Sequence, residues 1–217
     1  MSSQRFSRLA GSTLALGGLL WITIHMLVII DGLITGKLVW ATNAHQPLLT
    51  YIYFLLQPLA SVMLGLGLLS GFARLEGHAR RLGITGFVLA SIGTVTGIIY
   101  LIFLTISATP LNGFLGVLEA SANALNGLST LAATLVLGCA ALRAHILPRS
   151  FAWTLIVIGI VTAPILLVTP LPIGPDWATD TIAFFLSGIG YTVVGMKMLT
   201  MDRKAPQQQV SLSATTR

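Results

Sequence analysis

Six long apolar stretches, separated by short polar segments, dominate the pattern of hydrophobic and polar positions along the chain. A helix needs about 20 apolar residues to cross the hydrocarbon core of a membrane. Because backbone polar groups in lipid must bond within their own segment, each stretch predicts an α-helix. The predicted spans are Leu9–Ile30, Leu48–Phe72, Leu82–Ile106, Phe114–Leu142, Phe151–Leu171 and Trp177–Met198.

The pattern therefore predicts an all-α fold, a polytopic membrane bundle of six transmembrane helices over residues 1–201. Residues 202–217 are rich in Gln, Ser and Thr, and they predict a polar, disordered cytoplasmic tail. The single cysteine, Cys139, lies inside an apolar stretch and is interpreted as a packing residue.

The basic residues predict which side of the membrane each end occupies. With the N-terminus inside, the outer connections carry only Lys37. Cytoplasmic loops are enriched in Lys and Arg, so both termini are predicted to be cytoplasmic. The residues on the predicted inner side are Arg5, Arg8, Arg74, Arg80, Arg81, Arg143, Arg149, Lys197, Arg203, Lys204 and Arg217, whereas Asp31, Asp176 and Asp180 fall outside.

Composition agrees with lipid as the surrounding solvent. The 217 residues are 55% hydrophobic and 8% charged, with a net charge of +6, whereas a soluble domain has about 25% charged residues. The basic residues occupy short loops and form no stripe with interleaved aromatics, which favours anionic membrane lipid over nucleic acid as their partner.

Polar residues in the fourth span follow the helical period. Their successive spacings of seven, four, three, four and four residues place them on one narrow face. A polar line along a helix cannot face lipid, so this face should point into the bundle. The line consists of Asn112, Glu119, Asn123, Asn126, Thr130 and Thr134.

Three other predicted helices carry polar groups at a depth similar to that of Glu119, in the outer half of the bundle. They are His25, Gln57 and Tyr100. One hypothesis is a ligand-binding polar site formed by Glu119, Asn123, Asn126, His25, Gln57 and Tyr100. The alternative is that these groups bond to one another and to backbone only to fix helix packing. No catalytic or metal-binding residue is predicted.

Small residues predict close helix packing inside the bundle. Gly93 and Gly97 form a Gly-x-x-x-Gly pair in the third span, and Gly188 and Gly195 flank Tyr191 in the sixth. In a bundle of this size they indicate intramolecular contact rather than a dimer face.

His25 also allows a haem or chlorin to be considered, since histidine is an axial ligand of such groups. A second histidine is needed for bis-histidine ligation. His78 and His145 fall in predicted inner connections, so only His45 in the outer connection could approach it. No cofactor is otherwise predicted.

Two short motifs resemble a known group. Arg8–Gly11 reads Arg-x-x-Gly at the start of the first span, and Leu147–Trp153 reads Leu-Pro-Arg-x-x-Ala-Trp before the fifth. In these motifs and in its hydropathy the chain resembles uncharacterised bacterial six-helix integral membrane proteins of a domain-of-unknown-function type. The resemblance implies a multi-pass protein of the bacterial plasma (inner) membrane and no particular activity.

Three functions remain open. The first is a non-enzymatic subunit or scaffold that binds lipid or a partner membrane subunit. The second is a small carrier or sensor that uses the Glu119 site, in which Glu119→Gln should abolish transport or pH response. The third is a membrane enzyme or cofactor protein. The chain lacks the His-Glu-x-x-His, Gly-x-Ser-x-Gly and Walker motifs, which places the third function last.

Overall fold

The structure is a computed structural model that describes residues 3–35, 47–75, 80–106, 113–145, 147–167 and 178–215. Over these ranges the ordered elements are helices, which confirms the all-helical prediction. The elements are α1 (Ser3–Thr35), α2 (Pro47–Phe72), the 3₁₀ turn η2 (Ala73–Leu75), α3 (Arg80–Ile106), α4 (Gly113–Ala144), α5 (Arg149–Leu167) and α6 (Ala178–Thr215).

Among the described residues, five helices are long and apolar enough to cross a membrane, which supports the assignment as a membrane protein. Their qualifying segments are Arg8–Ile34, Leu55–Phe72, Arg81–Phe103, Leu115–Ala144 and Thr181–Met201. In α5 the described apolar segment, Arg149–Thr162, is shorter. Many large apolar side chains on these helices are exposed, and lipid rather than water is the solvent that suits such a surface.

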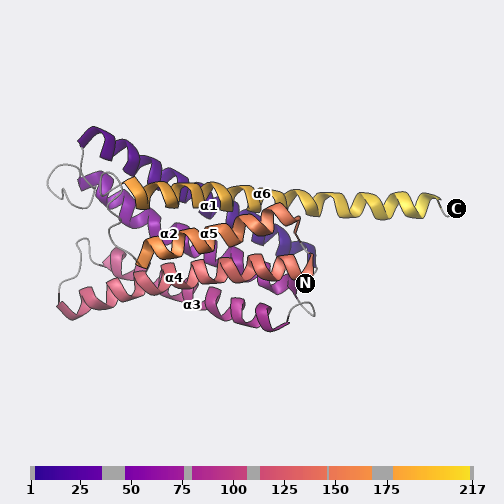
Figure 1. Cartoon of the computed structure of the whole chain (residues 1–217), viewed down its shortest axis with the longest axis horizontal. Helices are drawn as coiled ribbons and strands as arrows, with labels where there is room; N and C mark the ends of the chain where they lie inside the picture. Colours follow the sequence, from indigo (N-terminus) through magenta and orange to yellow (C-terminus); the bar gives the residue numbers. More distant parts are fainter. Residues whose placement is uncertain are drawn as a thin grey trace.

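The helices form a closed ring in chain order. Each helix packs against the next, α6 packs against α1, and α2 also contacts α4 (Figure 1). Because consecutive helices run in opposite directions, basic residues from five helices gather at one end of the bundle, called the basic end below. They are Arg8, Arg81, Arg143, Arg149 and Lys197.

Glycines let α1 and α6 approach until their backbones touch. A Cβ added at Gly195 would lie 2.5 Å from the Ala15 nitrogen and 2.6 Å from the Gly11 carbonyl oxygen. One added at Gly18 would lie 2.6 Å from the Gly188 carbonyl oxygen. Close backbone approach maximises dispersion contacts, which drive helix association in lipid.

A second glycine contact joins α4 to α5. A Cβ at Gly138 would lie 2.8 Å from the Ala152 carbonyl oxygen, and one at Gly159 would lie 3.1 Å from that of Leu131. On α3, Gly93 faces the Thr130 side chain and Gly97 faces that of Asn126. The glycines predicted to serve intramolecular packing do so.

Two helix ends differ from the predicted spans. α1 continues past Ile30 to Thr35, and Asp31, predicted to lie on the outer side of the membrane, falls within this helix and is only 4% exposed. α6 continues to Thr215 through the segment predicted to be disordered, and it projects beyond the other helices (Figure 1). Extending an existing helix avoids the cost of nucleation, so polar residues that follow a packed helix can continue it.

Candidate functional site

The polar line on α4 faces the bundle interior, as the spacing predicted. Glu119, Asn126, Thr130 and Thr134 are buried and Asn123 is half-buried. Asn112 lies outside the described residues. Polar groups placed on this face escape contact with lipid, so the helical period alone was sufficient to orient α4.

Two hydrogen bonds along this line hold α4 to its neighbours, and a third lies within α4 itself. The Asn126 side-chain amide donates to the Gly93 carbonyl of α3 at 2.8 Å. Thr134 donates to the Thr130 carbonyl of its own helix at 2.8 Å. Since that uses the only hydroxyl proton of Thr134, the Tyr191 hydroxyl of α6 is the donor in their 2.7 Å contact. This part of the line serves packing.

Glu119 and Tyr100 lie together at the other end of the line. They belong to the adjacent helices α4 and α3 and are 9% and 4% exposed. The Glu119 carboxylate is close enough to act electrostatically on the Tyr100 hydroxyl. The structure therefore brings together two of the residues predicted to form the polar site.

His25 packs toward a different neighbour. Its Nδ1–H donates to the Trp21 carbonyl at 2.8 Å. Its ring lies 5.3 Å from that of Phe184 on α6 and 6.0 Å from that of Trp21. Gln57 on α2 is half-buried. The described contacts of His25 thus join α1 to α6, whereas those of Glu119 and Tyr100 join α4 to α3. A single site that includes both remains a prediction.

The haem or chlorin alternative rests on the remaining ring nitrogen of His25. Because Nδ1 carries the proton donated to Trp21, Nε2 is the atom with a free lone pair. Aromatic side chains occupy the surroundings of the ring, and His45 lies outside the described residues. No group of three or more His, Cys, Asp or Glu side chains suited to a metal occurs in the described part of the chain.

Two buried polar atoms have no hydrogen-bond partner within the described ranges: Trp21 Nε1 and Thr130 Oγ1. The Trp21 ring lies among those of His25, Phe184 and Tyr191. A buried donor without an acceptor costs about 1–3 kcal/mol. Thr130 belongs to the polar line predicted to face the interior, whereas Trp21 was not identified from sequence, because an isolated Trp in an apolar helix gives no sign of its surroundings.

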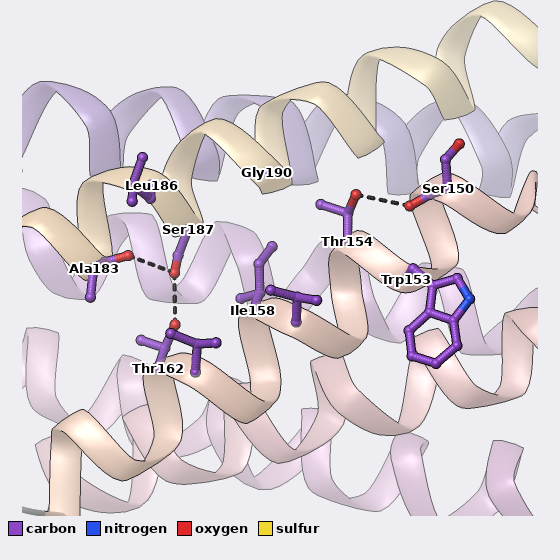
Figure 2. Close-up of a pocket in the computed structure, with 11 residues that line it drawn as sticks. Ser150, Trp153, Thr154, Ile158, Thr162, Ala183, Leu186, Ser187 and Gly190 are labelled. Carbon is purple, nitrogen blue, oxygen red and sulfur yellow. Dashed lines mark hydrogen bonds between the residues drawn. The ribbon is translucent and has the colours of Figure 1, made fainter.

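A groove lies between α5 and α6, and the sequence did not predict it. Its volume is about 410 Å³, within the 300–1,000 Å³ range of ligand pockets. Figure 2 shows the two helices side by side, with Ser150 toward one end of the groove and the Thr162–Ser187 pair toward the other. The lining residues are Ser150, Trp153, Thr154, Val157, Ile158, Val161, Thr162, Ala183, Leu186, Ser187 and Gly190.

The hydroxyl groups in the groove are largely occupied by internal bonds. Ser187 donates to the Ala183 carbonyl at 2.8 Å, so Thr162 is the donor in the 2.7 Å contact between the Thr162 and Ser187 hydroxyls. Thr154 donates to the Ser150 carbonyl at 2.9 Å. With these protons used, the groove presents an apolar wall to an occupant (Figure 2).

The packing of the ring explains why this groove exists. Gly188 and Gly195 let α6 pack closely against α1, and Gly159 lets α5 pack closely against α4. Each of the two helices is therefore held by its other neighbour, and the interface between α5 and α6 is the least extensive in the ring. Side chains there meet over a smaller area and leave the space open.

The fold of the described residues defines the class of the protein: a helical membrane bundle with a lipid-compatible surface and a lateral groove between α5 and α6. Comparisons of the chain with protein-family models, with curated proteins and with solved structures found no match.

Proposed function

We propose that the protein is a non-enzymatic integral membrane component that binds an apolar chain of membrane lipid in the groove between α5 and α6. The observation that carries the proposal is the chemistry of the groove. Val157, Val161 and Leu186 supply alkyl surface, while Thr162 and Ser187 satisfy each other. A polar solute would find few donors there, whereas a hydrocarbon chain needs none.

The position of the groove supports lipid as its occupant. Leu186 is 58% exposed and Trp153 is 55% exposed, so the groove opens on the outer surface of the ring. In a bilayer that surface is bathed in acyl chains. An open apolar groove is filled by what surrounds it, because an unfilled one forfeits the dispersion contacts of its lining.

A groove-filling substitution tests this proposal. Leu186→Trp is expected to reduce the amount of lipid that remains bound when the protein is extracted from its own membrane. Displacing even two methylene groups from the groove costs about 1.6 kcal/mol, roughly tenfold in affinity. Native mass spectrometry measures the lipid-bound fraction directly.

Ile189→Trp is the matched control, because Ile189 lies on α6 close to Leu186 and is exposed without lining the groove. It should leave the lipid-bound fraction unchanged. Equal lipid retention by the two variants would reject the groove as the binding site. If a second protein co-purifies with the unsubstituted chain and with Ile189→Trp but not with Leu186→Trp, the occupant of the groove is a helix of that partner instead of lipid.

The proposal includes six membrane crossings and a cytoplasmic location for both termini. α5 has 19 residues, about 28 Å at the rise of an α-helix, close to the thickness of the hydrocarbon core. The basic end carries Arg8, Arg81, Arg143, Arg149 and Lys197, and such residues are retained on the cytoplasmic side.

Reporter accessibility tests this orientation. A protease-cleavable tag after Arg217 should be protected in intact cells and cleaved once the membrane is permeabilised. A tag in the connection between α1 and α2 should show the opposite behaviour. Cleavage of the carboxyl-terminal tag in intact cells would reverse the orientation.

A further inference from the structure

We infer that the groove selects an anionic phospholipid from the leaflet at the basic end, with the headgroup beside Arg149 and one acyl chain along α5. This inference rests on the proposed function and specifies its ligand. Three independent features of the groove lead to it: its length, the charge at one end and the aromatic side chain on its rim.

The length of the groove fits one leaflet. The α5 lining residues run from Ser150 to Thr162, which corresponds to about 18 Å along the helix axis. Half of a hydrocarbon core about 30 Å thick is about 15 Å. A chain that enters beside Ser150 would therefore reach the middle of the bilayer beside the Thr162–Ser187 pair (Figure 2).

Positive charge lies at the end where a headgroup would sit. Arg149 is exposed and begins α5, and Ser150 next to it lines the groove. Lys197 of α6 lies across this junction, with its Nζ 5.6 Å from the centre of the Phe151 ring on α5. Asp31 and Glu119 are on parts of α1 and α4 far from this end, whereas Asp202 follows Lys197 by five residues on α6. A phosphate here would meet two cations.

The backbone at the start of α5 reinforces this charge. The Pro148 carbonyl accepts hydrogen bonds from the amides of Phe151 at 3.0 Å and Ala152 at 3.2 Å, which fixes the first turn. The amino end of a helix carries a partial positive charge, which adds to that of Arg149.

Trp153 marks the depth at which headgroup and chain meet. Its ring is exposed on the rim of the groove, one helical turn from Arg149. Tryptophan is enriched where acyl chains give way to headgroups. A lipid in the groove would thus have its glycerol region beside Trp153, its phosphate beside Arg149 and its chain against Val157 and Val161.

Reconstitution of the delipidated full chain tests the inference. Nanodiscs of phosphatidylcholine are compared with nanodiscs that contain one-fifth phosphatidylglycerol, and native mass spectrometry counts the lipid retained. Phosphatidylglycerol should be retained preferentially. Arg149→Gln should weaken that preference roughly fivefold, since a basic residue near an anionic surface contributes about 1 kcal/mol. Arg149→Lys should preserve most of it.

Arg81→Gln is the control, because Arg81 is exposed at the same basic end but lies on α3, away from the groove. It should leave the preference intact. An equal loss in Arg81→Gln and Arg149→Gln, or equal retention of the two lipids by the unsubstituted chain, would overturn the inference while leaving the proposed groove in place. Insensitivity of all retained lipid to Leu186→Trp would instead reject the proposed function itself.

Discussion

Gly195→Ala is expected to destabilise the bundle by about 2–3 kcal/mol, the cost of forcing extra volume into a close-packed contact. The added Cβ would lie 2.5 Å from the Ala15 nitrogen and 2.6 Å from the Gly11 carbonyl oxygen. Both are backbone atoms, so no rotamer change relieves the clash and α6 must move away from α1. Denaturant unfolding of the purified protein in detergent measures the loss.

Gly83→Ala is the matched control for this substitution. A Cβ there would lie 3.7 Å from the Leu75 Cβ, an ordinary contact distance. Alanine is favoured over glycine in a helix by up to about 1 kcal/mol, so this variant should be as stable as the unsubstituted protein or slightly more so. If Gly195→Ala behaves like Gly83→Ala, then α1 and α6 are not in backbone contact.

Tyr191→Phe is expected to lower the free energy of unfolding by about 1–2 kcal/mol, because a buried hydrogen bond is lost and its acceptor stays desolvated. Tyr191 is fully buried, and its hydroxyl donates to Thr134 across the interior of the ring. The remaining ring still packs against Trp21, which limits the loss to the polar contact. Detergent unfolding again provides the measurement.

A double-mutant cycle isolates that bond. Thr134→Val removes the partner and also the bond from Thr134 to the Thr130 carbonyl. The double variant should therefore be about 1 kcal/mol more stable than the sum of the single losses implies. Additive losses would show that the Tyr191 and Thr134 hydroxyls do not bond to each other in the folded protein.

The helices were predictable from sequence because hydropathy measures the property that lipid selects. The predicted third span, Leu82–Ile106, ends at the same residue as α3. The predicted first span ends at Ile30, whereas α1 continues to Thr35. Asp31, the next residue after that span, is buried within the helix, and hydropathy carries no information about which charges find partners.

The candidate site was only partly predictable. The period of Glu119, Asn126 and Thr134 identified the inward face of α4 without knowledge of its neighbours. Pairing His25 with Glu119 required knowing which helices are adjacent, and depth alone does not provide that. The groove could not be found from sequence, since Thr162 and Ser187, 25 residues apart in the chain, bond to each other only after α5 and α6 have met.

The ring also determines the order in which its contacts can be made during synthesis. Its most extensive interface joins the first helix to the last, so the glycine surface of α1 has no native partner until α6 leaves the ribosome. Closure of the ring is therefore a late step that follows release of nearly the whole chain. A nascent chain shortened before Gly188 and Gly195 would keep five neighbouring helices but leave α1 without the surface that completes its packing.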